Sequence, residues 1–363
     1  MAEKRKLRFG VIGAGDFAEV CHIPGLQSHP EAQVVALCAR RYAHARALAD
    51  RFCVPDVHLD YHELCSRDDL DGITIATPNV WHAEQALAAL QYGKHVFCEK
   101  PLAMNVGEAE QMLRAAEPSG RVHQVAFTYR YLYSVRELRR RLQAGEIGEP
   151  YYLRVQYDSW VGLQPDWKVN WRVRSKIAGG GMLYDLGSHL FDVACFVLGP
   201  IEAVTGFVHN LPRERAELHG GEAVEVETDD IAAALFRFKS GARGQWFISR
   251  VTPPHAENGY VEVVGPKGAL KASLSRGSVD ILKASRPDRP NWEELPLPEE
   301  ARDGRPHSLG IMMRSFVDAC LRSSLDGDND ASFDDGFAVQ RAIAAVLKAN
   351  DNLTWVSLSE ATS

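Results

Sequence analysis

Apolar and polar positions in the first third of the chain switch repeatedly between the spacing of strands and that of helices. Helical spacing predicts helices at residues 18–26, 42–52, 81–92 and 106–116. Short apolar runs between them predict strands at residues 7–12, 33–38, 71–76, 95–98 and 122–127. Strands that alternate with helices are typical of a doubly wound parallel sheet. We therefore expect an α/β Rossmann-type domain over residues 1–127.

The pattern changes after residue 127. A basic helix is expected at 134–144, and two amphipathic helices at 314–322 and 337–349. The Pro-rich, polar stretch 284–308 reads as a loop. Strand-like runs dominate the rest, at residues 151–157, 201–208, 231–238, 242–250, 259–264 and 269–274. We expect an α+β domain over residues 128–363 with a large, mostly antiparallel open sheet, whose uncovered face is a candidate subunit interface.

Composition limits the classes of function. The 363 residues are 45% apolar and 25% charged, as in soluble globular proteins, and the formal net charge of −7 argues against a nucleic-acid partner. We expect no signal peptide in the charged first residues, and we expect no apolar run to span a bilayer. Seven cysteines lack paired zinc spacing. We expect a cytoplasmic protein with reduced thiols, no membrane contact and no metal site.

A dinucleotide fingerprint follows the first strand. Gly13, Gly15 and Ala18 have the spacing G-x-G-x-x-A, and Asp16 and Phe17 lie in the same turn. The first glycine permits a tight turn, the second lets the backbone approach a pyrophosphate, and the alanine lets the helix pack closely on the strand. A second strand at βαβ spacing strengthens the prediction of a dinucleotide site.

The second strand ends in Ala39, Arg40 and Arg41. An NAD site usually has an acidic residue here that accepts a hydrogen bond from the ribose 2′-hydroxyl, whereas two arginines suit a 2′-phosphate. We therefore expect NADP to be preferred over NAD, with Arg40 in contact with the phosphate or the adenine. Two solvated arginines at the start of a helix are the alternative interpretation.

Polar residues also end two later strands, where ligands sit in open α/β sheets. After residue 98 the chain continues Glu99, Lys100 and Pro101, and proline restricts the lysine to an extended conformation that aims its side chain. The alternative for Lys100 is a solvated lysine at a strand exit, and Asn79 is also explained as a helix cap. Candidate cofactor contacts after residue 76 are Thr77, Pro78, Asn79 and His82.

A glycine-rich start at residues 179–181 precedes a helix that is expected to end near residue 198. Asp185, His189 and Asp192 fall at i, i+4 and i+7 on one face of it. Such a stripe of titratable groups suits acid–base chemistry, although a lone histidine on an apolar helix is more often a core residue. Three tryptophans before it suit stacking on a sugar ring or simple core packing: Trp160, Trp167 and Trp171.

Taken together, the fingerprint, Glu99-Lys100-Pro101, Tyr129-Arg130, Trp171-Arg172 and the 179–192 helix resemble the Gfo/Idh/MocA oxidoreductases. The resemblance implies that Lys100, Asp185 and His189 are catalytic and that Glu99 and Lys100 lie beside the nicotinamide. It also implies that the Lys100–Pro101 peptide bond is cis and that subunits pair through the open sheet as a homodimer or homotetramer. Ala39-Arg40 and Thr128 depart from the usual family pattern.

The function expected from these residues is hydride transfer between a nicotinamide and a secondary alcohol or ketone of a sugar, cyclitol or related polyol. His189 would take the hydroxyl proton, Lys100 would stabilise the oxyanion and Asp185 would orient both, although a lysine of lowered pKa also suits the proton transfer. Expected substrate contacts are Arg130, Trp171 and Arg172. Two alternatives stay open: a glycoside hydrolase that uses NAD, and a non-catalytic nucleotide-binding regulator.

Overall fold

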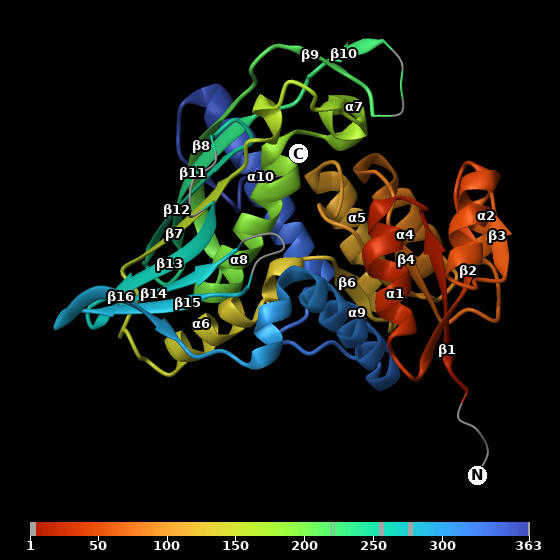
Figure 1. Cartoon of the computed structure of the whole chain (residues 1–363), viewed down its shortest axis with the longest axis horizontal. Helices are drawn as coiled ribbons and strands as arrows, with labels where there is room; N and C mark the ends of the chain where they lie inside the picture. Colours follow the sequence, from red (N-terminus) through yellow and green to blue (C-terminus); the bar gives the residue numbers. More distant parts are fainter. Residues whose placement is uncertain (1–4, 219, 221, 254–257, 275–278, 362–363) are drawn as a thin grey trace. The chain divides into compact units, whose positions relative to one another are not determined.

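The computed structural model describes residues 5–218, 220, 222–253, 258–274 and 279–361. The chain divides into two compact units, coloured along the sequence in Figure 1. The first comprises residues through Phe127 together with Ser308–Phe337, and the second comprises Thr128–His307 together with residues from Ala338 onward. The chain therefore passes between the units more than once.

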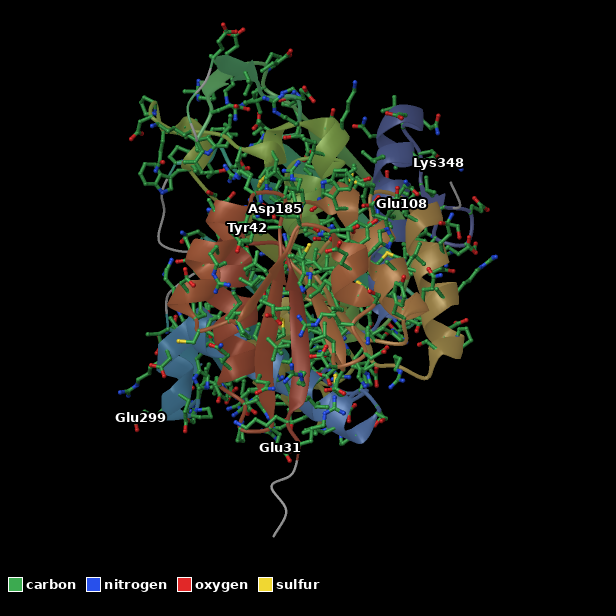
Figure 2. The ribbon with its side chains drawn as sticks, turned by 90° about the vertical axis from the view of Figure 1, so that its right-hand side faces the viewer. Glu31, Tyr42, Glu108, Asp185, Glu299 and Lys348 are labelled. Atoms are coloured by element: carbon green, nitrogen blue, oxygen red, sulfur yellow. The ribbon has the colours of Figure 1, made fainter. Side chains whose placement is uncertain are left out.

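A six-stranded parallel sheet forms the centre of the first unit, with the strand order β3-β2-β1-β4-β5-β6. Figure 2 shows Glu31, which precedes β2, at the amino ends of the strands, and Tyr42, which follows β2, at their carboxyl ends. The candidate residues that follow strands all lie at the carboxyl-end side of the sheet, because the strands are parallel. The strands are β1 (Leu7–Ile12), β2 (Ala32–Cys38), β3 (Asp56–His58), β4 (Gly72–Ile75), β5 (His95–Cys98) and β6 (His123–Val125).

Helices alternate with these strands, as the hydrophobic pattern predicts. The helix after the fingerprint differs from the expectation, because it begins as a π-helical turn, η1 (Ala18–His22), and continues as α1 (Ile23–Gln27). The short strand β3 has no apolar core position and was not expected from the pattern. The other helices are α2 (Tyr42–Arg51), α3 (Tyr61–Cys65), η2 (Asn79–Trp81), α4 (His82–Gln91), α5 (Val106–Ala116) and η3 (Glu117–Ser119).

Residues 308–337 complete the core of the first unit, whereas the change of pattern after residue 127 predicts that they belong to the second domain. The amide of Val125 donates to the carbonyl of Ala331 at 2.8 Å. The ring of Phe316 lies 5.8 Å from that of Phe9 and 5.3 Å from that of Phe97. These contacts join residues some two hundred or more positions apart, so a pattern of neighbouring residues cannot reveal them.

The second unit is built on a nine-stranded sheet of order β16-β15-β14-β13-β7-β12-β11-β8-β17. Among the described strands of this sheet only β7 and β12 pair in parallel, so the sheet is mostly antiparallel, as expected. A separate two-stranded ribbon contains β9 (Glu214–Ala216) and β10 (Ala223–Glu225). The sheet strands are β7 (Tyr152–Asp158), β8 (Ile201–His209), β11 (Ile231–Phe238), β12 (Arg243–Ser249), β13 (Gly259–Gly265), β14 (Gly268–Ser273), β15 (Leu282–Arg286), β16 (Arg289–Leu295) and β17 (Val356–Ser357).

One face of this sheet is covered and the other is exposed. Phe191, from the central helix α8 (Ser188–Leu198), packs against Phe236 and Trp246 of the sheet, with ring centroids 6.0 and 5.1 Å away. On the opposite face, Leu235 is 49% exposed and Phe207 is 46% exposed. The remaining helices are η4 (Thr128–Tyr131), α6 (Tyr133–Gln143), η5 (Val161–Leu163), η6 (Trp171–Val173), α7 (Ser175–Ala178), η7 (Leu183–Gly187), η8 (Glu299–Asp303), α9 (Gly304–Arg322) and α10 (Phe333–Asn352).

One expectation for this part of the chain was wrong. Residues 284–308 are not a loop, because they contain most of β15, all of β16 and the start of α9. β16 lies at the edge of the sheet and is exposed along almost its whole length, so it lacks the apolar alternation that marks a strand.

Residues 175–198 form a helical segment that is long and apolar enough to cross a membrane. Its most apolar window is 83% buried within the protein, as in the core helix of a globular domain.

Candidate active site

The fingerprint turn has the geometry that its glycines suggested. Gly13 has φ +106°, and a β-carbon there would lie 2.5 Å from the carbonyl oxygen of Ala76. Gly15 is exposed, and a β-carbon on it would face open space. Helical turns begin directly after it, and Ala18 is completely buried. The turn therefore presents free backbone to a ligand at a helix N-terminus, which is the arrangement that holds a pyrophosphate.

Two neighbours of this turn differ in their exposure. Asp16 is exposed and Phe17 is half-buried. His44, on α2, places its Nε2 atom 2.7 Å from the carbonyl oxygen of Ala14. This contact fixes the fingerprint turn to the next helix, and the sequence analysis missed it because no motif marks His44.

The residues that follow β2 are largely exposed to solvent. Ala39 is half-buried, and its amide donates to the carbonyl of His58 at 3.2 Å. Arg40 and Arg41 are both exposed, and Arg41 is the N-cap residue of α2. Their guanidinium groups therefore stand in solvent at the edge of the sheet that carries the fingerprint.

His82 joins the loops that follow β4 and β5. It is completely buried, with Nε2 2.9 Å from the carbonyl oxygen of Thr77 and Nδ1 2.8 Å from that of Pro101. Burial lowers the pKa of this imidazole, and the two carbonyls oppose that shift. The Thr77 hydroxyl donates to Gln85 at 2.7 Å, and Asn79 is buried as the first residue of η2, directly after Pro78. His82 thus contacts the backbone of both loops, and donates to one of the two carbonyls when its ring is neutral.

The loop after β5 carries Glu99, Lys100 and Pro101. The Lys100–Pro101 peptide bond is cis, as the resemblance implied. Glu99 is 7% exposed, with Oε1 3.2 Å from Nε2 of His22 and Oε2 3.3 Å from the Lys100 amide. Burial raises the pKa of Glu99, but the hydrogen bond from His22 and nearby positive charge, including Lys100, outweigh it and leave the pKa below its usual value. His22 is a residue that no sequence motif had marked.

In the second unit the helix of Asp185 and His189 begins directly after the glycines, as expected, but it is not regular. It starts at Met182 and passes through the π-helical turn η7 before α8. Asp185 lies in the π-turn and is half-buried, whereas His189 in α8 is 2% exposed. A π-turn changes the angular spacing of side chains, so the i, i+4 relation of a regular helix does not hold here.

Asp229 holds the beginning of this helix. Its carboxylate accepts from the amides of Gly181 at 2.6 Å and Leu183 at 2.8 Å. A β-carbon on Gly181 would overlap the Asp229 backbone, so only glycine fits. Burial raises the pKa of Asp229, although the two amides oppose the shift. No sequence motif marks Asp229, which lies almost fifty residues from the helix that it caps.

Two neighbouring residues contact α8: Tyr129 lies beside His189, and Arg130 pairs with Asp192. The Tyr129 ring lies 4.7 Å from the His189 ring, and its hydroxyl is buried without a hydrogen-bond partner among the residues described. Arg130 is 4% exposed and donates through Nη2 to Asp192 at 2.6 Å and through Nε at 2.9 Å. This geometry makes Arg130 a buried partner of α8, and its contact with substrate stays a prediction.

The three tryptophans are not equivalent. Trp167 packs on the small cluster of Val169, Val173 and Val226, and the guanidinium carbons of Arg213 and Arg250 lie 5.4 and 5.1 Å from its ring centre. Trp171 is half-buried, and the Arg172 guanidinium lies 4.6 Å from its ring centre. Trp160 is 47% exposed. Trp167 therefore packs within the protein, which agrees with core packing, the alternative interpretation to stacking on a sugar ring.

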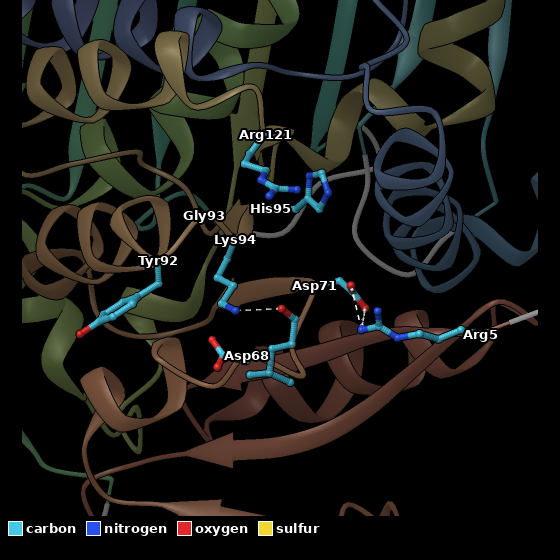
Figure 3. A pocket seen from close by; sticks show the side chains of 9 residues that line it. Arg5, Asp68, Asp71, Tyr92, Gly93, Lys94, His95 and Arg121 are labelled. Atoms are coloured by element: carbon cyan, nitrogen blue, oxygen red, sulfur yellow. Dashed lines mark hydrogen bonds and ion pairs between the residues drawn. The ribbon is translucent and has the colours of Figure 1, made fainter.

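A small cavity of about 220 Å³ lies at the amino ends of the parallel strands (Figure 3). The Lys94 ammonium donates to the carbonyls of Arg67 at 2.6 Å and Leu70 at 2.9 Å, and Arg5 pairs with Asp71 at 3.1 Å. These polar groups hydrogen-bond or pair with one another at the amino ends of the strands, whereas ligands bind at the carboxyl ends in open α/β sheets. The candidate cofactor site is therefore at the carboxyl ends, where the fingerprint turn lies.

The residues of the first unit fit a nicotinamide dinucleotide. An exposed Gly15 backbone faces open space, solvated arginines follow β2, and Lys100 follows β5 at the same edge of the sheet. Within the described residues, no group of three His, Cys, Asp or Glu side chains is placed to hold a metal ion. The fold and this site define a dinucleotide-binding Rossmann protein with a second, α+β unit.

Comparison with known proteins identifies the family. Residues 7–127 match the model of the oxidoreductase family with an NAD-binding Rossmann fold, and residues 135–271 match the GFO/IDH/MocA C-terminal domain. Levoglucosan dehydrogenase of Pseudarthrobacter phenanthrenivorans is 31% identical over 345 residues, which are 87% of each chain. The chain belongs to the Gfo/Idh/MocA family of NAD-dependent oxidoreductases.

Other relatives share the same architecture. Myo-inositol 2-dehydrogenase of Thermotoga maritima is 29% identical over 287 residues, which are 78% of this chain and 80% of that protein. A solved structure of levoglucosan dehydrogenase in complex with NADH and levoglucosan has a TM-score of 0.87 and 26% identity, and the match covers 98% of this chain and 100% of that chain. The similarity therefore extends over both units.

Proposed function

We propose that the protein oxidises a secondary alcohol of a sugar, cyclitol or related polyol, or reduces the corresponding ketone. The observation that carries the proposal is the position of Lys100, which follows β5 at the same sheet edge as the fingerprint turn after β1. Relatives named for levoglucosan, myo-inositol and 1,5-anhydro-D-fructose support this substrate class. No contact among the described residues favours the glycosidase or regulator alternatives.

The cofactor would be held by the fingerprint turn (Gly13, Gly15, Asp16, Phe17, Ala18), by Ala39, Arg40 and Arg41 after β2, and by the loops that contain Thr77, Pro78, Asn79, Glu99 and Lys100. Bound there, it would supply the acceptor or donor of a hydride. We propose a preference for NADP, because Arg40 and Arg41 are exposed and able to pair with a 2′-phosphate. His82 would contribute by holding the two loops rather than by direct contact.

The catalytic residues proposed are Lys100, Asp185 and His189. In the oxidation direction the substrate C–H bond breaks with loss of a hydride, and the O–H bond breaks with loss of a proton to His189. The Lys100 ammonium would donate to the developing oxyanion, and the Asp185 carboxylate would orient His189. Lys100 remains an alternative proton acceptor. Trp171 and Arg172 are proposed substrate contacts, and Arg130 is proposed to hold α8 in place.

A turnover screen tests this proposal. The purified protein would be titrated with NADPH and NADH by fluorescence, then assayed with levoglucosan, myo-inositol and ketosugars by nicotinamide absorbance. Lys100→Met should bind the cofactor but lose turnover, because the oxyanion loses its charged donor, whereas Lys6→Met at the opposite sheet edge should match the parent. Absence of cofactor binding, or full activity of Lys100→Met, would rule the proposal out.

We also propose that two copies associate through the exposed face of the nine-stranded sheet. Aromatic and aliphatic side chains on that face, including Phe207 and Leu235, are nearly half exposed. Light scattering on Leu235→Glu should show a smaller species than the parent. A parent that is monomeric at all concentrations would contradict this.

A further inference from the structure

His22 and Glu99 form a buried pair that links the fingerprint helix to the loop of Lys100. His22 is the last residue of η1, the helical turn that begins three residues after Gly15. It is completely buried, and its ring meets the edge of Phe97 at 5.4 Å with an interplanar angle of 84°. Glu99 follows β5 directly and precedes Lys100. The pair therefore joins the two segments of the first unit that carry the proposed cofactor and catalytic groups.

The hydrogen-bonding pattern fixes the direction of this contact. A carboxylate only accepts hydrogen bonds, so Nε2 of His22, 3.2 Å from Oε1, carries the proton. Nδ1 of His22 is buried and has no hydrogen-bond partner within the described residues. The other carboxylate oxygen faces the Lys100 amide at 3.3 Å. The Glu99 carboxylate thus accepts one hydrogen bond from the His22 ring and another from the Lys100 backbone amide.

We propose that His22 is a positioning residue, which acts through the Glu99 carboxylate to hold the Lys100 backbone in a fixed place relative to the fingerprint helix. Glu99 then serves mainly as the connector and not as a direct cofactor contact. This inference rests on the proposed function, since it assigns a purpose to the position of Lys100. A buried carboxylate needs such a donor, because an unpaired charge is costly inside a protein.

Three variants separate positioning from simple packing. His22→Leu keeps an apolar side chain against Phe97 but removes the donor. His22→Gln restores an N–H group that can reach the carboxylate. His29→Leu is the matched control, because Nε2 of His29 also lies 3.2 Å from a carboxylate oxygen, that of Asp318, in the same unit.

The first readout is kinetic. We expect His22→Leu to lower kcat by roughly 10- to 100-fold, since small displacements of a catalytic group have effects of this size. The substrate KM should change much less, and His22→Gln should recover most of the loss. His29→Leu should keep the parent kcat. Equal kcat values for His22→Leu and His29→Leu, or no recovery with Gln, would overturn the inference.

The second readout does not need turnover. Hydrogen exchange of the Lys100 amide, followed by mass spectrometry on the peptide around Glu99, should be faster in His22→Leu than in the parent or His29→Leu. Thermal unfolding and NADPH fluorescence report whether each variant is folded and binds cofactor. A parent that binds no cofactor would refute the proposed function, whereas unchanged Lys100 exchange in a folded His22→Leu would refute the positioning role by itself.

Discussion

The carboxylate of Asp229 accepts a hydrogen bond from the Gly181 amide at 2.6 Å and so caps the helix that carries Asp185 and His189. Asp229→Ala would leave two buried amides without an acceptor, at a cost of about 1–3 kcal/mol per buried group. We expect a loss of that order in the free energy of urea unfolding. Asn105→Ala removes the exposed cap of α5 and should cost only about 1 kcal/mol. Equal losses in the two variants would contradict the buried cap.

Arg40 is the residue on which the choice of cofactor is expected to depend. Arg40→Asp replaces a solvated guanidinium at the end of β2 with the acid that usually accepts from a ribose hydroxyl. The Kd for NADPH should rise by roughly 10- to 100-fold, the size of a lost charge-assisted hydrogen bond, while the Kd for NADH should fall. Fluorescence titration measures both constants, and Arg114→Asp on α5 controls for net charge. A parent that binds NADH more tightly than NADPH would refute the preference.

Tyr129 offers a test that separates stability from activity. Its hydroxyl is buried and has no hydrogen-bond partner in the described part of the chain, so Tyr129→Phe breaks no internal bond. The free energy of unfolding should be unchanged or rise by up to about 1 kcal/mol, because a desolvated hydroxyl is removed. Because the ring lies beside His189, kcat/KM measured on the same preparation shows whether the hydroxyl serves the substrate. A clear loss of stability would mean that the hydroxyl has a structural partner.

Arg130 and Asp192 form a buried ion pair, with 4% and 1% of each residue exposed. Arg130→Met or Asp192→Leu alone leaves an uncompensated charge and should cost about 3–5 kcal/mol of unfolding free energy. The double variant should recover most of this, because two apolar side chains need no partner. Arg114→Ala, which breaks an exposed pair with Glu110, should cost less than about 1 kcal/mol. A double variant as unstable as the sum of the single ones would argue against this account.

Asp280 makes stability depend on pH. Burial raises its pKa to about 6, opposed by the amides of Ser134 and Tyr133 and by His307. The folded state binds its proton more tightly than the unfolded state, so this stability is present at low pH and lost as the pH rises through about 6. A shift of this size corresponds to roughly 3 kcal/mol. Asp280→Asn should therefore gain up to that amount at about pH 8 and little at about pH 4.

Urea unfolding at both pH values checks the Asp280 expectation. Asp166→Asn, an exposed carboxyl in the same unit, should show no such dependence. If Asp280→Asn and the parent had the same stability difference at both pH values, the buried carboxyl would not be responsible.

The sequence by itself determined most strands and helices of residues 7–127, the fingerprint and the family. Period-two and helical spacing are local properties, and the G-x-G-x-x-A turn is read from six neighbouring residues, so these features need no knowledge of distant contacts. The same local reasoning failed at β16, because an exposed edge strand has no buried face to mark it.

Tertiary structure alone revealed the partners of the candidate residues. Glu99 meets His22 across 77 positions, Asp229 caps a helix almost fifty residues earlier, and Arg130 is neutralised by Asp192. Each pair forms because burying a polar group requires a partner wherever the fold brings one. That requirement is imposed by three-dimensional packing, and no spacing within the sequence records it.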